Sequence, residues 1–210
     1  MLPGGLGSSR FVTYAKGYGV SLTNSESYKL CTLWKSTFPE MKHHLKPQPM
    51  FDTGCEGLYM VKTLTGRWRR KCVFCAALNT DFQGLAADCS KEAGWRLFRS
   101  GFFLVNFIHD EYIAEIPLDN HFTERCNLMA HIMRQAMQQI TPDVKVKASP
   151  AAMLKWCKAA EEYYDGEGDL IPWEWVPKNP KGDMIDWKDL TQVEQDRILK
   201  EKHARFNKQK

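Results

Sequence analysis

FFLVNFIHDEYIAEI, residues 102–116, is the segment from which the fold is most readily inferred. Two runs of apolar and β-favouring side chains, Phe102–Ile108 and Tyr112–Ile116, flank the polar tripeptide His109-Asp110-Glu111. Strand-forming runs that are separated by a short polar stretch are typical of a β-hairpin. The segment therefore predicts two antiparallel strands that carry three polar side chains at their tip.

Helix-forming segments lie on both sides of this hairpin. Between Phe82 and Leu97, apolar residues recur at spacings of three and four, which is the period of one helix face. We expect Thr80 to cap this helix and Ser100-Gly101 to end it, and Asn120 to cap a second helix over Phe122–Ile140. The other predicted elements are, in chain order, helices over Ser9–Gly17 and Thr23–Phe38, a loop over Lys46–Gly57, strands over Leu58–Thr63, Arg67–Phe74 and Val144–Lys147, and helices over Ser149–Tyr163 and Thr191–Phe206.

The order of these elements predicts an α+β fold. Strands, a helix, the hairpin, a helix and a strand follow one another, which is typical of an antiparallel sheet with helices on one face. We expect three parts: helices in residues 1–50, the sheet in residues 51–164, and an extended arm in residues 165–210. The composition of the arm changes to glycine, proline, tryptophan and charged residues.

Bulk composition favours an intracellular, cytoplasmic protein with one domain and an appended tail. The chain has 210 residues, of which 43% are hydrophobic, so it can bury a core. No apolar run approaches the length of a membrane span, and no export signal opens the chain. The seven cysteines are scattered, which favours reduced thiols, and the single Cys72-x-x-Cys75 pair has no second pair to complete a zinc site.

Positive charge is clustered rather than abundant, since the formal net charge is only +4. Local concentration of basic side chains matters more than the sum for binding nucleic acid. Two clusters stand out, Lys62, Arg67, Arg69, Arg70 and Lys71 in the middle of the chain and Arg197, Lys200, Lys202, Arg205, Lys208 and Lys210 at its end.

The predicted hairpin tip offers carboxylates at the edge of a rigid sheet. Magnesium prefers carboxylate oxygens and binds where a substrate phosphate completes its coordination shell. In-line phosphoryl transfer by two metal ions needs at least one further carboxylate besides Asp110. Taken alone, His109-Asp110-Glu111 also fits an ordinary solvated turn, because these residues are common in exposed turns.

Three motifs in a fixed order distinguish these readings. Thr63-Leu64-Thr65-Gly66-Arg67 forms a basic turn, Asn79–Asp88 reads Asn-Thr-Asp-Phe-Gln-Gly-Leu-Ala-Ala-Asp, and Phe107–Tyr112 contains His-Asp-Glu. Together, over residues 1 to about 160, they resemble the family A DNA polymerases, the family of bacterial polymerase I and many phage replicases. The resemblance implies that residues 1–50 are a remnant of the fingers and that residues 51–164 are the palm.

The resemblance also implies roles for individual residues. Asp110 would be a catalytic ligand of Mg²⁺, Glu111 an accessory catalytic carboxylate, and His109 a group that positions the primer terminus. Asn79 and Gln83 would approach the primer–template duplex, where an amide can contact groove acceptors that every base pair shares. The basic hairpin, through Arg67, Arg69 and Arg70, would contact backbone phosphates.

Departures from the family pattern shape the functional hypothesis. The first family motif, with the other catalytic aspartate, and the basic part of the fingers helix are missing, and Cys75 stands where many relatives have arginine. We therefore expect one half of a split polymerase that uses a deoxynucleoside triphosphate and needs an N-terminal partner chain. A truncated or interrupted gene would explain the same pattern.

Other functions fit parts of the sequence. A non-catalytic DNA-binding or scaffolding subunit would keep the palm shape and use only the basic hairpin and tail. A small metal nuclease built on His109-Asp110-Glu111 would need a second acidic cluster, and the sequence offers only scattered acidic residues. Thr80-x-x-Gln83 also fits a capping box without any role in DNA binding.

Overall fold

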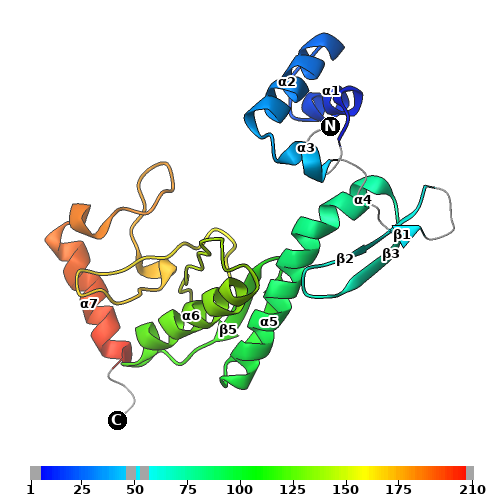
Figure 1. Cartoon of the computed structure of the whole chain (residues 1–210). Helices are drawn as coiled ribbons and strands as arrows, with labels where there is room; N and C mark the ends of the chain where they lie inside the picture. Colours follow the sequence, from blue (N-terminus) through cyan, green and yellow to red (C-terminus); the bar gives the residue numbers. More distant parts are fainter. Residues whose placement is uncertain (1–5, 46–50, 53–56, 207–210) are drawn as a thin grey trace. The chain divides into compact units, whose positions relative to one another are not determined.

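The computed structural model describes residues 6–45, 51–52 and 57–206, and they form an α+β protein (Figure 1). The chain divides into two compact units, Met1–Asp88 and Cys89–Lys210. The fold class expected from the sequence is confirmed. The described strands form two separate antiparallel sheets, one of three strands and one of two, instead of the single sheet that we expected.

The first unit begins with three helices: α1 (Ser8–Gly17), α2 (Asn24–Thr37) and α3 (Met41–His44). Thr23 caps α2 through a capping box, because its hydroxyl oxygen accepts from the Glu26 amide while its own amide donates to the Glu26 carboxylate. The Ser27 hydroxyl donates to the Ser8 carbonyl at 2.6 Å and joins α2 to α1. Both predicted helices are confirmed.

A three-stranded sheet follows, with β1 (Phe51–Asp52), β2 (Tyr59–Lys62) and β3 (Trp68–Cys72) paired in that order. The β2–β3 hairpin turns at Gly66, whose φ of +96° suits glycine. This hairpin was predicted, whereas β1 lies in the expected loop. The second predicted strand was too long, because β3 ends at Cys72 and the next helix begins at Phe74.

One continuous helical run follows β3: α4 (Phe74–Asn79), the π-helical segment η2 (Thr80–Gly84) and α5 (Leu85–Arg99). The prediction that Thr80 caps the helix was wrong. Thr80 has helical dihedral angles, and its hydroxyl donates to the Ala76 carbonyl at 2.7 Å. The Thr80 side chain therefore bonds to a carbonyl inside the helical run and not to the amides at a helix start. The alternative capping box from Thr80 to Gln83 is excluded for the same reason.

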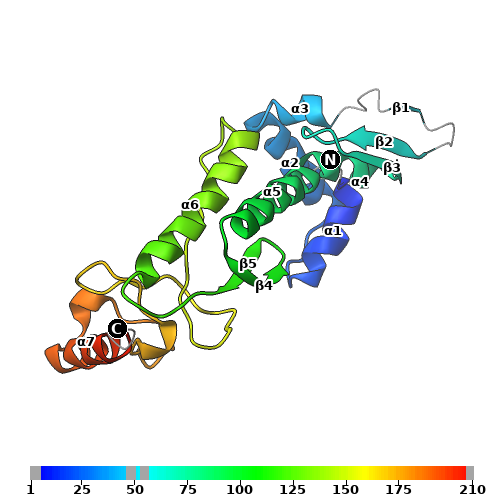
Figure 2. The same cartoon turned by 90° about the horizontal axis from the view of Figure 1, so that it is seen from below.

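The second unit contains the hairpin that the sequence predicted, formed by β4 (Phe103–Ile108) and β5 (Glu111–Glu115). A register shift between Leu104 and Asn106 marks a bulge in β4. The long helix α6 (Phe122–Ile140) follows, and Figure 2 shows it apart from the hairpin in a second view. Its N-cap is His121, so the prediction of Asn120 was wrong. The Asp119 carboxylate lies at this end of the helix, where it accepts a hydrogen bond from the His121 amide and forms an ion pair with Arg125.

Residues 141–163 contain no helix or strand, so the strand predicted over Val144–Lys147 and the helix predicted over Ser149–Tyr163 were both wrong. Their backbone groups bond to distant partners. The Arg134 guanidinium donates to the Ala148 carbonyl at 3.0 Å, and the Glu174 carboxylate accepts from two amides of the segment. Such partners satisfy backbone groups that a helix would have paired internally.

The C-terminal arm contains two short 3₁₀ helices, η3 (Trp173–Trp175) and η4 (Trp187–Asp189), and ends in α7 (Gln192–Phe206). The basic helix predicted near Thr191–Phe206 is confirmed. Two apolar clusters hold the arm, one around Leu170 and Phe206 and another around Ile171 and Ile198. In the part of the chain that the structure describes, no helix has the length and apolarity to cross a membrane.

Candidate functional site

The tip of the β4–β5 hairpin is a two-residue turn, because Ile108 pairs with Glu111 across it. His109 has a φ of +57°, in the left-handed region, which is uncommon for a residue other than glycine but fits the first position of a primed hairpin turn. The side chains of His109 and Asp110 are exposed, and Glu111, the first residue of β5, is half-buried. The turn therefore presents Asp110 to solvent beside a second carboxylate.

Tyr112 anchors this hairpin to α5. Its ring stacks on Phe107 across the strands, with 4.5 Å between centroids, and its hydroxyl donates to the Ser90 carbonyl at 2.8 Å. Burial raises the pKa of the Tyr112 hydroxyl, so it stays protonated and can donate. Gly94 lies directly under the ring, and any larger side chain there would collide with it. Glu111 thus begins a braced strand, and Asp110 lies in the turn directly before it.

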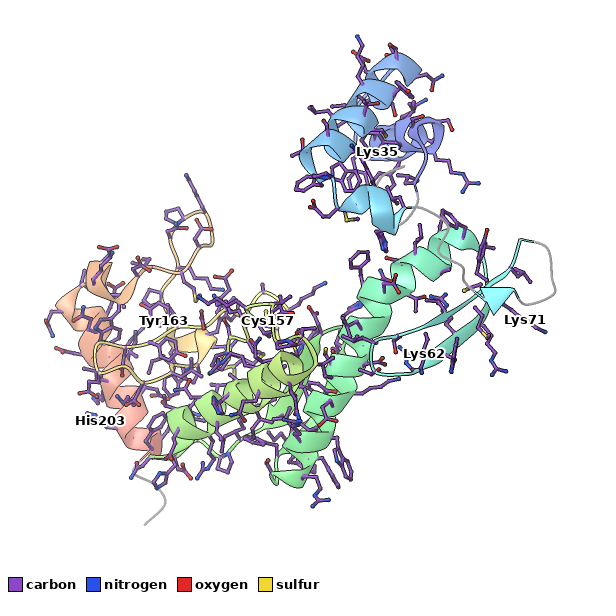
Figure 3. The ribbon with its side chains drawn as sticks, viewed as in Figure 1. Lys35, Lys62, Lys71, Cys157, Tyr163 and His203 are labelled. Atoms are coloured by element: carbon purple, nitrogen blue, oxygen red, sulfur yellow. The ribbon has the colours of Figure 1, made fainter. Side chains whose placement is uncertain are left out.

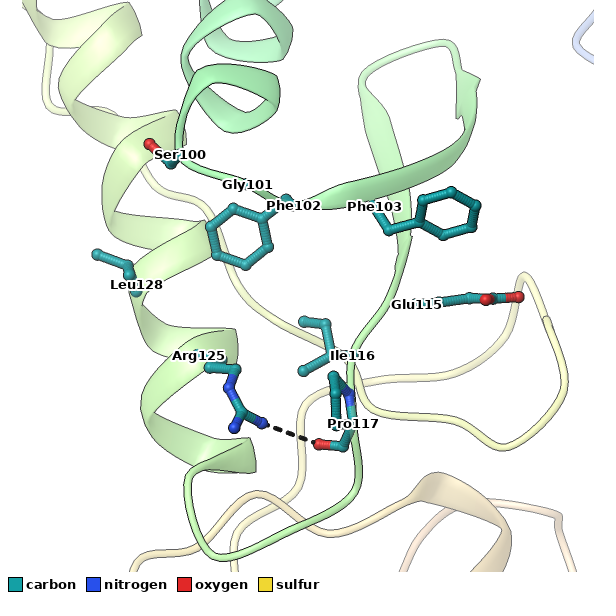
Figure 4. A pocket seen from close by; sticks show the side chains of 9 residues that line it. All are labelled: Ser100, Gly101, Phe102, Phe103, Glu115, Ile116, Pro117, Arg125 and Leu128. Atoms are coloured by element: carbon teal, nitrogen blue, oxygen red, sulfur yellow. Dashed lines mark hydrogen bonds between the residues drawn. The ribbon is translucent and has the colours of Figure 1, made fainter.

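A cavity of about 630 Å³ lies at the other end of the hairpin. It is lined by Phe103 and Glu115, which pair at the base of the strands, and by Arg125 and Leu128 of α6 (Figure 4). The Arg125 guanidinium donates to the Pro117 carbonyl at 3.2 Å on its wall. Because the hairpin separates this cavity from the turn, Asp110 does not contribute to it.

A cluster of three carboxylates in the arm meets the distance criterion for a metal site. Ligand atoms of Asp165, Glu167 and Asp169 all lie within 4.8 Å of one another, and among the described residues no other group of three or more His, Cys, Asp or Glu does so. The Lys202 ammonium already occupies this cluster, at 2.7, 2.6 and 2.7 Å from the three carboxylates. A cation of the protein itself therefore neutralises the acidic loop.

The pKa shifts of these carboxylates and of Lys202 agree with that pairing. The hydrogen bond from Lys202 lowers the pKa of the Glu167 carboxyl. Burial raises the pKa of Asp169, but the bonds it accepts outweigh burial and hold that pKa below its ordinary value. Burial likewise lowers the pKa of Lys202, and the three carboxylates more than reverse that effect.

In the first unit, Arg67 is held by a buried carboxylate. Its Nε donates to Asp88 Oδ1 at 2.7 Å and its Nη2 to the Gly84 carbonyl at 3.1 Å, while the Thr65 hydroxyl donates to Asp88 Oδ2. Burial raises the pKa of Asp88, but the hydrogen bonds from the threonines and Arg67 outweigh burial and keep that pKa low. Arg67 thus fastens the β2–β3 turn to the helical run.

Arg69 makes a second bridge between the hairpin and the helical run. Its Nη1 donates to the Thr80 hydroxyl at 3.1 Å and to the Ala76 carbonyl at 3.4 Å. These bonds flank Asn79, the half-buried last residue of α4, and the bond from Arg67 to Gly84 lies next to the exposed Gln83. The structure thus brings Arg67 and Arg69 together with the segment that carries both predicted amides.

Arg70 differs from these two arginines. Its side chain is exposed and makes no hydrogen bond or ion pair with the side chains and backbone groups that the structure describes. Lys62 and Lys71 lie on the same hairpin (Figure 3), and the Lys62 ammonium sits 5.5 Å from the centroid of the Trp68 ring. The hairpin therefore keeps cations available to an anionic partner even though Arg67 and Arg69 are engaged.

Two residues of the second basic cluster, Lys202 and Arg205, form ion pairs within the arm. Lys202 is buried against its three carboxylates, Arg205 pairs with Glu201 at 2.7 Å, and Arg197 donates to the Trp175 carbonyl at 3.2 Å. Lys208 and Lys210 lie outside the described residues. Within the described residues of this cluster, Lys202 is buried, whereas Arg197, Lys200 and Arg205 are exposed.

Comparisons with models of known families and with curated proteins found no match to this chain. The polymerase hypothesis therefore depends on the three sequence motifs and on the chemistry of the residues described above.

Sequence reasoning missed three contributors to these sites. Asp88 was part of a quoted motif, but nothing in the sequence indicated that it holds Arg67. Lys202 lies 37 residues beyond Asp165, so their pairing has no local signal, although the spacing of Asp165, Glu167 and Asp169 is visible. Trp156 was placed in a helix that does not form, and its indole Nε1 donates to Glu111 Oε1 at 3.4 Å.

Proposed function

We propose that this chain is the C-terminal part of a template-directed, Mg²⁺-dependent DNA polymerase. The observation that carries the proposal is the tip of the β4–β5 hairpin, where Asp110 is exposed beside Glu111 on a strand braced by Tyr112. Carboxylates held this way suit a hard cation that also binds phosphate oxygens.

In the proposed reaction, the 3′-hydroxyl of a primer attacks the α-phosphate of a deoxynucleoside triphosphate and pyrophosphate leaves. Asp110 would hold Mg²⁺, which lowers the charge on the reacting phosphate, and Glu111 would assist as the adjacent carboxylate. His109 would position the primer terminus from the same turn. Catalysis would come mostly from positioning and from neutralising charge.

DNA binding is assigned to the β2–β3 hairpin and the helical run behind it. The exposed Arg70 would contact a backbone phosphate, and Gln83 and Asn79 would approach the duplex through their amides. Arg67 and Arg69 contribute mainly by fixing the segment that carries these amides, since their donors are bonded within the unit. Phosphate contacts of this kind weaken as salt concentration rises.

The proposal includes a further carboxylate from another polypeptide. Two-metal phosphoryl transfer needs a bridging carboxylate, and Asp110 belongs to no ligand group of three among the described residues. We assign the missing aspartate, and the lysine that grips the triphosphate, to an N-terminal polymerase half. Its sequence should contain an Asp-x-Ser-x-x-Glu-Leu-Arg-like strand and a lysine-bearing helix.

The test is primer extension by this chain mixed with that N-terminal half. We expect synthesis from the mixture only, and we expect Asp110→Ala to reduce it by at least about a thousandfold, because the removed carboxylate acts on the transition state. Binding of primer–template, measured by fluorescence anisotropy, should change little. Asp143→Ala, at another exposed aspartate of the second unit, is the matched control. Full synthesis by the Asp110→Ala mixture would remove Asp110 from the reaction.

A second candidate is a non-catalytic DNA-binding or scaffolding subunit. It is favoured by the same lack of a complete ligand group at Asp110 and by the cations that remain on the β2–β3 hairpin. The two functions separate in one experiment. A scaffold would keep salt-sensitive DNA binding that Arg70→Ala weakens, while Asp110→Ala would leave the activity of every complex unchanged.

A further inference from the structure

Trp156 connects the C-terminal arm to the hairpin tip. It lies in the segment without helix or strand, 45 residues from Glu111 in sequence, yet its indole Nε1 donates to Glu111 Oε1 at 3.4 Å. Trp156 is 50% exposed, so half of its surface is buried and half is open to solvent. The bond engages one oxygen of Glu111 and leaves the other oxygen for a different partner.

The arm fixes the backbone on the N-terminal side of Trp156. Glu174, in η3, accepts hydrogen bonds from the amides of Leu154 and Lys155, each at 2.9 Å, and the Trp173 amide donates to the Ala152 carbonyl at 2.9 Å. Burial raises the pKa of Glu174, but these backbone bonds outweigh burial and lower it, so the carboxylate stays ionised as an acceptor. Glu174 of η3 thus holds the backbone directly before Trp156, and the Trp156 indole in turn bonds to Glu111.

We propose that Trp156 is a positioning residue for the metal site at the hairpin tip, and that Glu174 holds Trp156 in place for this task. The inference depends on the proposed function, because it treats Asp110 and Glu111 as the metal-binding pair. A glutamate side chain has three rotatable bonds and can adopt many orientations. The hydrogen bond from Trp156 restricts these orientations beforehand, so less conformational entropy is lost when the ion binds. Groups that orient metal ligands in this way typically change metal affinity by about 10–100-fold.

This arrangement gives the arm a functional role. Without Trp156, the carboxylate of Glu111 would sample several orientations in solvent, and the ion would be held mainly by Asp110. With it, a segment that has no regular structure of its own sets the geometry beside the turn. The arm would then be needed for metal affinity as well as for covering the apolar cores around Leu170 and Ile171.

The first test measures Mn²⁺ binding to the mixture of this chain with the N-terminal half, by the electron paramagnetic resonance signal of the free ion. Asp110→Asn identifies the part of the binding that belongs to the tip and leaves any ion elsewhere unaffected. Trp156→Phe keeps an aromatic ring but removes the N–H donor, and we expect it to weaken the Asp110-dependent binding about tenfold. Trp95→Phe, at an exposed tryptophan of α5, is the matched control and should bind as the wild type does.

The second test uses the complex that extends primers. Trp156→Phe should raise the Mg²⁺ concentration needed for half-maximal synthesis about tenfold and leave the rate at saturating Mg²⁺ nearly unchanged. Glu174→Gln, which keeps Trp156, should shift the Mg²⁺ requirement in the same direction by less. A variant that was merely misfolded would not recover its rate when Mg²⁺ is added.

The outcomes separate the two proposals. If Mn²⁺ binding does not depend on Asp110, the proposed metal site fails and the role of Trp156 fails with it. If binding depends on Asp110 but Trp156→Phe leaves both the Mn²⁺ affinity and the Mg²⁺ requirement unchanged, only the positioning role is overturned. Loss of rate in Trp156→Phe that saturating Mg²⁺ does not restore would also overturn it.

Discussion

The hairpin tip and the loop Asp165–Asp169 both present carboxylates, but only the loop contains its own cation. In the loop, Lys202 lies within 2.7 Å of three carboxylates, and the Asp165 side chain is fully buried. At the tip, Asp110 is exposed, and Glu111 accepts a hydrogen bond from the neutral indole of Trp156. The denser acidic cluster is therefore the structural one, and the sparser pair remains available to an external cation.

The same distinction separates the arginines of the β2–β3 hairpin. Arg67 is paired with the buried Asp88, whereas Arg70 has no ion-pair partner among the described residues. Charges that are neutralised inside a unit stabilise the fold, and charges that are not can bind an external ligand. Charge counts in the sequence do not make this distinction, because the partners lie far apart along the chain.

Removing the ammonium from the loop should have the largest effect on stability. Lys202→Met leaves the buried Asp165 without its cation, and breaking a buried ion pair in this way costs about 3–5 kcal/mol. Urea unfolding followed by far-UV circular dichroism measures the loss. Lys200→Met, at an exposed lysine of the same helix, should lower the free energy of unfolding by less than about 0.5 kcal/mol. Equal stability of the two variants would contradict the structural role of Lys202.

The pH dependence of stability should reveal the same pairing with a smaller effect. The pKa values of Glu167, Asp169 and Asp88 are lowered in the folded protein, so each contributes stability above its unfolded pKa of about 4. That contribution falls as the pH drops through the lower, folded values. We therefore expect the urea midpoint to decrease on acidification below about pH 4.5, and to decrease less steeply in Lys202→Met. A midpoint that rises in that range would contradict these shifts.

The local structure was predictable where a single signal was sufficient. Three local signals each predicted an element that formed: the capping box of Thr23 and Glu26, the Thr63–Arg67 turn, and the apolar runs that flank His109-Asp110-Glu111. The prediction at Thr80 was wrong because a threonine with glutamine three residues later resembles a capping box. The helix had in fact already begun at Phe74. Local patterns do not show where the hydrogen-bond partner of a hydroxyl lies.

Residues 141–163 could not be predicted for a related reason. The strand expected over Val144–Lys147 and the helix expected over Ser149–Tyr163 rested on local signals. Arg134, Glu174 and Trp173 instead bond to the backbone of this segment from outside it. Such tertiary bonds override local propensity. At the candidate site, the hairpin that carries Asp110 followed from the sequence, whereas the contact from Trp156 and the neutralisation by Lys202 needed the fold.

Magnesium should have the smallest effect, and its response to mutation tests the comparison most directly. An ion present at a concentration equal to its dissociation constant stabilises a protein by about 0.4 kcal/mol. We expect millimolar MgCl₂, compared with a chelator, to raise the free energy of unfolding by no more than about this amount. The gain should disappear in Asp110→Asn, because the loop Asp165–Asp169 already holds an ammonium. A larger gain that survives Asp110→Asn and is lost in Asp169→Asn would mean that a divalent ion displaces Lys202. The two acidic regions would then differ only in affinity for the ion, and the contrast between a structural loop and a functional tip would fail.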